Sequence, residues 1–486
     1  MQLTTLLKPL LTGVLSCTLI LNSFADVRLP ALVGSNMVLQ RNKPLNIWGW
    51  ADKGEKVTVS FRNGVYKTVT AADGKWKVQL PAQQAGGPYA MTVTGHNTIK
   101  LDNILVGEVW IASGQSNMEM PLKGWGKILN HDQEIAVANY PEIRLFQLKH
   151  TTSTAPLEDV NPWDGGWQAC TPQSIPEFSS VGYFFAREIY THEHIPVGVI
   201  HTSWGGTVAE AWTSGESIKK IPAFADTVKA FESLPTPLAP SNPNKATLLY
   251  NAMIHPLLPY AFRGVIWYQG EGNAERAYQY REVFPTMIKD WRKQWHNGDF
   301  PFYFVQLANF KDKQAQPVES DWAELREAQL MTLSLPNTGM ATAVDIGDAK
   351  DIHPKNKQEV GRRLSLIARA KVYGEKIPYS GPIYQSKLIA GNKVTLTFKN
   401  ADNGLVMKNG TTLKGFEVAG ADKKFHWAQA TISGNRVIVS SNEVDKPVAV
   451  RYSWADNPDG NLYSGAGLPA SPFRTDNFQG VTYGKK

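Results

Sequence analysis

Hydrophobic and polar positions follow one pattern over the first part of the chain. From residue 26 to about residue 102, short segments alternate apolar and polar residues, and turn sequences rich in Gly, Asn and Asp separate them. Alternation with a period of two is typical of strands that bury one face. The sequence therefore predicts a small N-terminal β-sandwich over 26–102. Its clearest strand segments are 56–61, 66–71, 75–80 and 89–95.

The pattern changes near residue 104, where apolar positions form continuous runs separated by longer stretches with helical periodicity. The runs are 104–112, 143–148, 196–202, 264–269, 302–307 and 340–346. The amphipathic stretches between them include 179–194, 276–295 and 321–333. Apolar strands that alternate with helices favour a parallel sheet covered on both faces. We therefore predict an α/β domain over 103–375.

A second change occurs near Gly381, after which short β segments return. We predict a C-terminal β domain over 376–486. Within the α/β part, the Pro-rich segment 234–245 is predicted to be a surface connection. The alternative is that this segment borders a cleft.

The first 25 residues have the pattern of a secretory signal. They combine one positive charge at Lys8, an apolar stretch from Leu10 to Leu21 and small residues Ser23 and Ala25 before a cleavage point. We interpret 1–25 as a signal peptide and expect a secreted protein, periplasmic or on the outer surface. A lipoprotein anchor on Cys17 is the less favoured alternative.

Composition narrows the class of protein. With 486 residues, 42% hydrophobic and 19% charged, the chain is globular and long enough for two or three domains. The formal net charge of +7 comes from scattered basic residues, so nucleic acid is not an expected partner. Beyond the signal, no apolar run is long enough to span a bilayer. Cleavage would leave Cys170 as the single cysteine, which excludes an internal disulfide.

The first apolar run ends on Gly114, Gln115, Ser116 and Asn117. In an open parallel sheet, ligands bind beyond the carboxyl ends of the strands. A tight strand-to-helix turn can expose a serine hydroxyl and direct backbone N–H groups at the same space. The same four residues also suit an ordinary turn and helix cap. Ser116 is therefore a candidate nucleophile that needs partners from elsewhere in the chain.

Two further strand ends carry groups that could bind an anion. Ser-Trp-Gly-Gly-Thr follows one run at 203–207, and Gly-Glu-Gly-Asn follows another at 270–273. Glycine backbone N–H groups and side-chain amides are the donors of an oxyanion hole. Each segment alone is an ordinary glycine turn. Together they place donors from two strand ends beside the serine.

A base for the serine is available near the end of the α/β part. Asp351 and His353 lie two residues apart on one loop, so the carboxylate can hold the imidazole Nδ1–H while Nε2 faces the serine. Pro354 suits the first position of a helix predicted over 355–370, which would place His353 at the cap of that helix. A capping histidine near an aspartate also occurs as ordinary structure.

Four sequence blocks together resemble those of bacterial sialate O-acetylesterase-like proteins, a carbohydrate-esterase branch of the SGNH hydrolases. The blocks are GEVWIASGQSNMEMPL, IHTSWGGTVAEAW, GVIWYQGEGNA and DIGDAKDIHPKNKQEVGRRL, in that order. The likeness runs from about residue 30 to 375 and, with the flanking β units, covers nearly the whole chain. It implies a three-layer αβα SGNH-hydrolase fold with a flavodoxin-like parallel sheet, and hydrolysis of O-acetyl esters on sugars without a metal or organic cofactor.

The resemblance also implies a role for each site residue. Ser116 would be the nucleophile, His353 the general base and then acid, and Asp351 the residue that orients it. The implied oxyanion hole takes its donors from Ser116, Gly205, Gly206 and Asn273. The implied supporting residues are Gln115, Gln269 and Glu271.

Two departures from the family pattern concern the substrate. The third block usually reads GESN in relatives, whereas here Gly272 replaces the serine. Some relatives also carry a β-domain between the second and third blocks, where this chain has only the Pro-rich segment 234–245. Such an insertion could form one wall of the cleft, so its absence leaves the identity of the substrate undetermined.

Two alternatives remain. The substrate could be acetylated xylan or xyloglucan in place of an O-acetylated sialic acid. The chain could also be a non-catalytic glycan-binding protein on an esterase scaffold, although a binding protein has no need for Ser116, His353 and Asp351 in register. Metal chemistry is set aside because His192 and His194 would not share one helix face, and no ordered ligand pattern is present.

Overall fold

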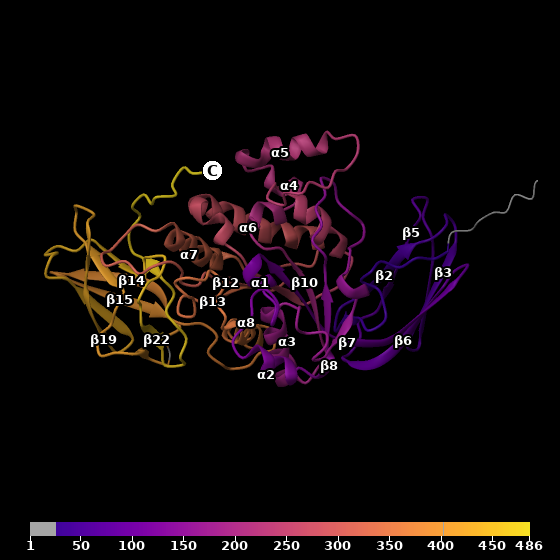
Figure 1. Ribbon diagram of the computed structural model, residues 1–486, viewed down its shortest axis with the longest axis horizontal. Helices are drawn as coiled ribbons and strands as arrows, with labels where there is room; N and C mark the ends of the chain where they lie inside the picture. Colours follow the sequence, from indigo (N-terminus) through magenta and orange to yellow (C-terminus); the bar gives the residue numbers. More distant parts are fainter. Residues whose placement is uncertain (1–25, 402) are drawn as a thin grey trace, which may run out of the picture.

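The computed structural model describes residues 26–401 and 403–486. The predicted signal segment, 1–25, lies outside the described residues. An α/β part occupies the middle of the molecule, and two β units lie at opposite ends of its longest axis (Figure 1).

The α/β part is built on a sheet whose strands are buried along most of their length. All neighbouring strands in it are parallel except the edge strand β9. The order is β13 (Thr338–Thr342), β12 (Phe302–Gln306), β11 (Gly264–Tyr268), β7 (Thr98–Gly114), β10 (Val197–Ser203), β8 (Tyr140–Gln147) and β9 (Gln168–Cys170). Because β7 lies at the centre, its carboxyl end is flanked by the ends of β10 and β11.

Helices cover both faces of this sheet (Figure 1). On one face, α3 (Ser180–Glu193) and α8 (Lys357–Lys371) pack closely, and a Cβ at Gly361 would lie 2.6 Å from Cβ of Phe184. On the other face lie α6 (Ala277–Trp295) and α7 (Asp321–Met331). The remaining α-helices of the described residues are α1 (Ser116–Glu119), α2 (His131–Ala136), α4 (Gly215–Ile218) and α5 (Pro222–Glu232). The predicted three-layer αβα arrangement is confirmed.

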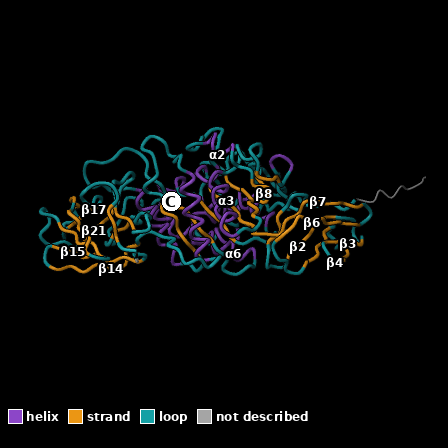
Figure 2. Tube along the Cα trace, turned by 90° about the horizontal axis from the view of Figure 1, so that it is seen from below, coloured by secondary structure: helices purple, strands orange, loops and turns teal. Residues whose placement is uncertain are grey.

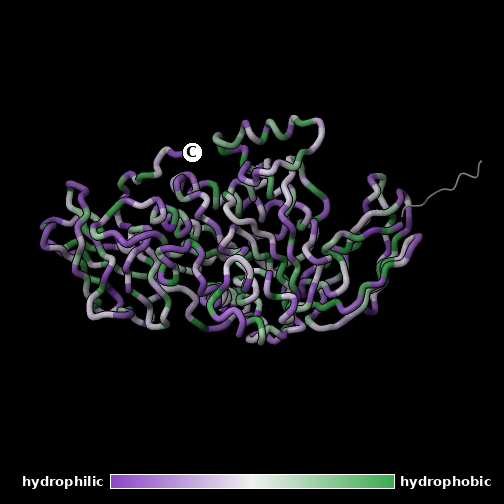
Figure 3. Tube along the Cα trace, in the orientation of Figure 1, coloured by the Kyte–Doolittle hydropathy of each residue, from purple (hydrophilic) through white to green (hydrophobic). Residues whose placement is uncertain are grey.

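Helix α5 stands out from the layer that contains α6. Figure 3 shows hydrophobic and hydrophilic positions alternating along it, and only Phe224 and Val228 of its residues are buried. The Pro-rich segment 234–245 follows α5. It returns to the strand ends, where the Asn244 side chain donates to the Gly206 carbonyl (3.0 Å) and accepts from the Val208 N–H (3.2 Å).

The N-terminal β unit shares a strand with the α/β part. Strand β7 runs without interruption from Thr98 to Gly114, pairing with β6 in its first half and with β10 and β11 in its second. Buried side chains of both parts form one continuous core. The other strands of this unit are β1 (Val38–Gln40), β2 (Leu45–Trp50), β3 (Lys56–Phe61), β4 (Gly64–Val69), β5 (Lys75–Leu80) and β6 (Gly86–Thr94).

The C-terminal β unit has a core of its own, which includes Val394, Phe416, Val439 and Tyr452. Figure 2 shows its strands gathered at one end of the molecule. They are β14 (Ile383–Ala390), β15 (Lys393–Lys399), β16 (Leu405–Met407), β17 (Phe416–Ala419), β18 (Phe425–Trp427), β19 (Gln429–Ser433), β20 (Arg436–Ser440), β21 (Ala449–Tyr452), β22 (Leu462–Ser464) and β23 (Phe473–Arg474).

A buried arginine joins this unit to the α/β part. The Arg326 guanidinium on α7 donates to the carbonyls of Leu307 and Ala308 after β12, and to those of Ala455 and Asp456 in the C-terminal unit, at 2.6–2.9 Å. Burial lowers the pKa of Arg326 to about 9, and no carboxylate bonds to it directly. Its hydrogen bonds to carbonyl groups therefore fix the C-terminal unit against the carboxyl end of β12.

Candidate active site

Ser116 lies on a sharp turn at the carboxyl end of β7. Gly114 has φ +139°, and a Cβ there would lie 2.1 Å from the Tyr268 carbonyl oxygen, so only glycine fits. The Gln115 N–H donates to that same carbonyl (3.0 Å), and α1 begins at Ser116. The end of β11 thus forces β7 to stop, and the serine follows immediately on a short helical turn.

The structure brings Ser116 and His353 together from positions far apart in the sequence. His353 Nε2 lies 2.9 Å from Ser116 Oγ. On the same loop, Asp351 Oδ1 accepts the His353 backbone N–H (2.9 Å) and lies 3.4 Å from His353 Nδ1. The carboxylate therefore faces the imidazole nitrogen that is not turned to the serine, as the spacing of the two residues predicts.

One detail of this loop differs from the prediction. Helix α8 begins at Lys357, and its cap is Asn356, whose side chain accepts the Glu359 N–H (3.1 Å). The prediction that Pro354 starts the helix and His353 caps it is therefore wrong. An asparagine side chain that accepts an N–H is a better cap than an imidazole, and it leaves His353 on the loop, free to face Ser116.

The surroundings of His353 favour its neutral form. Burial, followed by the nearby Lys357 cation, lowers the pKa of His353, while Asp351 and Glu119 act in the opposite direction. The indole of Trp125 meets the imidazole edge to face, with ring centroids 5.1 Å apart, and is 56% exposed. A neutral imidazole beside a serine hydroxyl can accept its proton.

A buried polar cluster lies beneath the serine. The Asn117 amide donates to Glu271 Oε1 (2.6 Å) and to the Ile352 carbonyl (3.0 Å), and its oxygen accepts from Lys357 Nζ (2.5 Å). Asn117 thus ties the serine turn both to the end of β11 and to the loop that carries His353. The prediction assigned Glu271 to a supporting position, but it did not include Asn117 or Lys357.

Burial shifts the pKa of both ionisable residues in this cluster. It lowers the pKa of Lys357 to about 7 and raises the pKa of Glu271, although the two charges attract. The Lys357 ammonium also lies over the ring of Tyr268, 5.2 Å from its centroid. The only sequence signal for Lys357 is that it follows His353 by four residues in the fourth block.

The remaining predicted supports hold the turn after β11. Gln115 Oε1 accepts the N–H groups of Gly270 (3.3 Å) and Gly272 (3.1 Å). The Gln269 amide donates to Asn273 Oδ1 (2.7 Å) and to the Thr207 carbonyl (3.1 Å). Both glutamines therefore connect the strand ends of β7, β10 and β11.

Asn273 is 2% exposed and takes part in several hydrogen bonds. Its oxygen also accepts the Ala209 N–H (2.9 Å), and its Nδ2 donates to Glu210 Oε2 (2.9 Å), which orients the amide. An amide nitrogen carries two hydrogens, so Nδ2 can donate one further hydrogen bond.

Gly205 lies directly against the nucleophile, and a Cβ there would be 3.3 Å from Ser116 Cβ. Its N–H donates to Glu119 Oε2 (2.5 Å), while Glu119 Oε1 contacts His150 Nε2 (2.8 Å). His150 in turn stacks on Trp204, with centroids 4.3 Å apart. A carboxylate of the protein therefore engages the Gly205 N–H, which sequence reasoning did not anticipate.

Gly206 and Gly272 serve different structural purposes. Gly206 has φ +71°, a conformation that glycine adopts without strain, and nothing occupies the space where its Cβ would be. Gly272 is a site of close approach, because a Cβ there would lie 2.9 Å from the Thr207 carbonyl oxygen. The glycine in the third block thus lets the loop after β10 lie directly on the turn after β11.

Among the described residues, one group has side chains spaced to hold a metal ion: Asp52, Glu55 and His96 in the N-terminal β unit. Its Glu55 carboxylate already accepts the N–H groups of Asp52 (3.1 Å) and His96 (2.6 Å). At the start of the loop that carries His353, Asp345 forms an ion pair with Arg363 (2.6 Å) and accepts from the Tyr463 hydroxyl (3.0 Å). Asp345 therefore braces the start of the His353 loop.

Comparisons with known proteins give matches along most of the chain. Residues 106–368 match the sequence profile of the family described as carbohydrate esterase, sialic acid-specific acetylesterase. Sialate O-acetylesterases of Homo sapiens and Pongo abelii are 33% and 32% identical to the chain, over 92% of each sequence. The crystal structure of a carbohydrate acetylesterase from Xanthomonas citri is 42% identical, with a TM-score of 0.85, over 93% of this chain and all of that one.

The class of protein follows from these matches together with the fold: it is a carboxylic ester hydrolase that acts on acetylated carbohydrate. More narrowly, the chain belongs to the sialic acid-specific acetylesterase family of carbohydrate esterases. No helix among residues 26–401 and 403–486 has the length and apolar character needed to cross a membrane.

Proposed function

We propose that the protein removes acetyl groups from sugar hydroxyls through an acetyl-enzyme intermediate on Ser116. The observation that carries this proposal is the 2.9 Å contact between Ser116 Oγ and His353 Nε2, with Asp351 behind the imidazole. A serine hydroxyl is a weak nucleophile unless a base takes its proton as it attacks. His353, whose lowered pKa keeps it neutral, is that base.

In the first half of the reaction, Ser116 Oγ attacks the acetyl carbonyl carbon while its proton moves to His353 Nε2. The resulting tetrahedral oxyanion accepts hydrogen bonds from the Ser116 N–H, the second hydrogen of Asn273 Nδ2 and a glycine N–H of Gly205 or Gly206. His353 then donates its proton to the sugar oxygen, and the C–O bond to the sugar breaks. Acetate remains esterified to Ser116.

In the second half, His353 takes a proton from a water molecule that attacks the acetyl carbonyl. The oxyanion forms again at the same donors, and its collapse returns the proton to Ser116 Oγ and releases acetate. Asp351 stabilises the imidazolium that forms in both halves. Because Glu119 engages the Gly205 N–H in this structure, its carboxylate has to move before Gly205 can donate to an oxyanion.

The direct test is hydrolysis of an aryl acetate, which needs no sugar recognition. Ser116→Ala should abolish turnover while the unfolding temperature remains close to that of the parent protein. Near-normal turnover by a folded Ser116→Ala protein would overturn the proposal. The relatives are named as esterases, which argues against the non-catalytic glycan-binding alternative.

For the substrate, we infer an O-acetylated sialic acid as the first candidate and acetylated xyloglucan or xylan as the second. The names of the mammalian relatives support the first. The exposed indole of Trp125 beside His353 suits either sugar, because it offers an apolar face next to the reacting ester. Acetate release from a panel of O-acetylated sialic acids, xylan and xyloglucan fragments separates the two candidates.

We also propose that the protein is exported, on the basis of the signal pattern in residues 1–25. N-terminal sequencing of the protein recovered from a periplasmic fraction should begin after Ala25. Recovery in the cytoplasm with Met1 intact would contradict this.

A further inference from the structure

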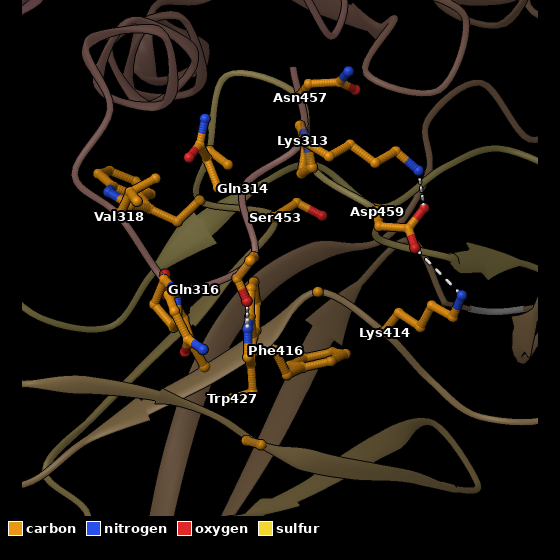
Figure 4. A pocket seen from close by; sticks show the side chains of 18 of the residues that line it. Lys313, Gln314, Gln316, Val318, Lys414, Phe416, Trp427, Ser453, Asn457 and Asp459 are labelled. Carbon is orange, nitrogen blue, oxygen red and sulfur yellow. Dashed lines mark hydrogen bonds and ion pairs between the residues drawn. The ribbon is translucent and has the colours of Figure 1, made fainter. Parts of the chain in front are cut away.

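A cavity lies where the C-terminal β unit meets the α/β part. It has a volume of about 380 Å³, within the range of roughly 300–1,000 Å³ usual for small-molecule sites. One wall is the loop 313–318, which follows β12, and the other is formed by residues of the C-terminal unit. Figure 4 shows side chains from both walls facing this space. None of its lining residues belongs to the Ser116 site.

The aromatic part of the lining is held in place. Trp427, at the end of β18, is 41% exposed, and its Nε1 donates to the Ala315 carbonyl on the opposite wall (2.9 Å, Figure 4). Phe416 and Trp454 line the same cavity and are buried. A fixed indole with an open face is a platform for an apolar ring face whose edge carries polar groups.

Two polar atoms in the cavity wall lack partners. Among the described residues, Glu417 Oε1 and Trp454 Nε1 are buried without any hydrogen bond. Their residues are 2% and 3% exposed. Buried polar atoms are rarely left unpaired, because each one costs about 1–3 kcal/mol. Because both residues line the cavity, its wall holds an unused acceptor and an unused donor just behind the surface.

The surroundings of Glu417 disfavour the ionised form of its carboxyl group. Burial, followed in the same direction by the carboxylates Glu319 and Asp476, raises its pKa to about 8, against the opposing effect of Arg451. Arg451 does not pair with Glu417, because it pairs with Glu319 (2.8 Å) and Asp476 (3.0 Å). At neutral pH the Glu417 carboxyl is therefore mostly protonated, and it can both donate and accept a hydrogen bond, as a hydroxyl group requires.

The charges at the rim are largely neutralised. Lys313 and Lys414 both pair with Asp459, at 2.6 and 3.3 Å (Figure 4). Amide side chains complete the polar lining: Gln314, Gln316 and Asn457. An aromatic platform, neutral donors and acceptors, and no concentration of one charge match a polyhydroxylated ring better than a phosphate or a lipid chain.

We propose that this cavity binds a pyranose ring of a carbohydrate, at a site additional to the one where the ester is cleaved. The ring packs on Trp427, and its hydroxyls pair with Glu417 and Trp454. This site goes beyond the proposed function, since it requires no chemistry at Ser116. Asn457 in its wall is linked through Asn309 (2.8 Å) to the Gly347 N–H (2.6 Å) at the start of the His353 loop, so the site is firmly attached to the catalytic part.

Calorimetric titration with two unacetylated probes tests the proposal, because neither is a substrate for ester cleavage. Xylotetraose represents a neutral glycan and N-acetylneuraminic acid an acidic one. At least one should bind, and Trp427→Ala should weaken its binding by about tenfold or more, while Trp427→Phe, which keeps the aromatic face, should weaken it less. The probe that binds identifies which kind of sugar the cavity accepts.

The matched control is Trp163→Ala, because Trp163 is a comparably exposed indole (47%) that does not line the cavity, and its removal should leave the affinity unchanged. Glu417→Gln should retain binding and Glu417→Leu should lose it. Absence of binding by both probes, or equal affinity for the parent, Trp427→Ala and Glu417→Leu proteins, would overturn the proposal. Aryl acetate turnover should be unchanged in these variants, so failure of this site and failure of the Ser116 mechanism are distinguished.

Discussion

The Ser116 site and the cavity beside the C-terminal β unit differ in how far their buried polar groups are paired. Beneath Ser116, Asn117 bonds to both Lys357 and Glu271, and this cluster fixes three segments of the chain, although Glu271 Oε2 has no partner among the described residues. In the cavity, Glu417 and Trp454 present polar atoms that nothing in the described chain satisfies. The first arrangement holds a catalytic geometry before any ligand arrives, whereas the second leaves hydrogen-bonding capacity for a ligand.

The largest effect is expected for Asn273→Ala. If Asn273 donates one hydrogen bond to the oxyanion, its loss should reduce turnover about 10²- to 10³-fold. Glu210→Gln is the matched control, because it weakens the partner that orients Asn273 without removing the donor, and it should cost less. Steady-state kinetics on an aryl acetate measures both. A loss of only a few-fold in Asn273→Ala would make Asn273 a structural residue.

Glu271→Leu should destabilise the protein by about 3 kcal/mol, because it leaves the Asn117 amide without a buried acceptor and removes the charge that attracts Lys357. Chemical denaturation measures the free energy of unfolding. The equivalent change in the cavity, Glu417→Leu, removes an atom that has no partner and should be neutral or stabilising by about 1 kcal/mol. Equal losses in the two variants would contradict the contrast between the sites.

Lys357→Met should move the acid limb of the pH profile of kcat/KM to higher pH. The Lys357 cation is the second cause, after burial, that lowers the pKa of His353, so removing it lets His353 keep its proton to higher pH. A protonated His353 cannot accept the serine proton. An acid limb at the same pH in both proteins would show that Lys357 acts only through packing.

A pH-dependent difference in stability is expected at Glu417. Its pKa is raised from 4.5 to about 8 in the folded state, so the unfolded chain loses this proton first as the pH rises. The associated stability is complete below pH 4.5 and declines as the pH rises through about 8. Relative to Glu417→Leu, the parent protein should therefore lose stability over this interval. If the difference in unfolding free energy between the two proteins stayed constant from about pH 4.5 to 9, the Glu417 carboxyl would not be buried in its protonated form.

Sequence patterns predicted the architecture and the order of the site segments well. The apolar runs 104–112, 196–202 and 264–269 correspond to the buried parts of β7, β10 and β11, and the residues that follow them meet at one edge of the sheet. Ser116, His353 and Asp351 could be named because their chemistry and spacing are local properties. The start of α8 was placed wrongly, because Pro354 and Asn356 both suit a helix start and only the structure shows which one caps it.

Residues whose roles depend on tertiary contacts gave no comparable signal. Lys357 reads as one cation in a basic helix, and only the fold places it in a buried cluster with Asn117. Glu119 reads as an acidic residue of a short helix, yet it bonds to the Gly205 N–H. The cavity beside the unpaired Glu417 exists only in the folded chain, because the loop and the strands that line it lie about a hundred residues apart in the sequence.

The central claim is that Ser116 carries the acetyl group during turnover. Rapid acid quenching of the enzyme with an aryl acetate, followed by proteolysis and mass spectrometry, measures this directly. The mechanism predicts acetylation confined to the peptide that contains Ser116, and no such peptide in Ser116→Ala. Continued turnover with no acetyl group on Ser116 at any time would contradict it.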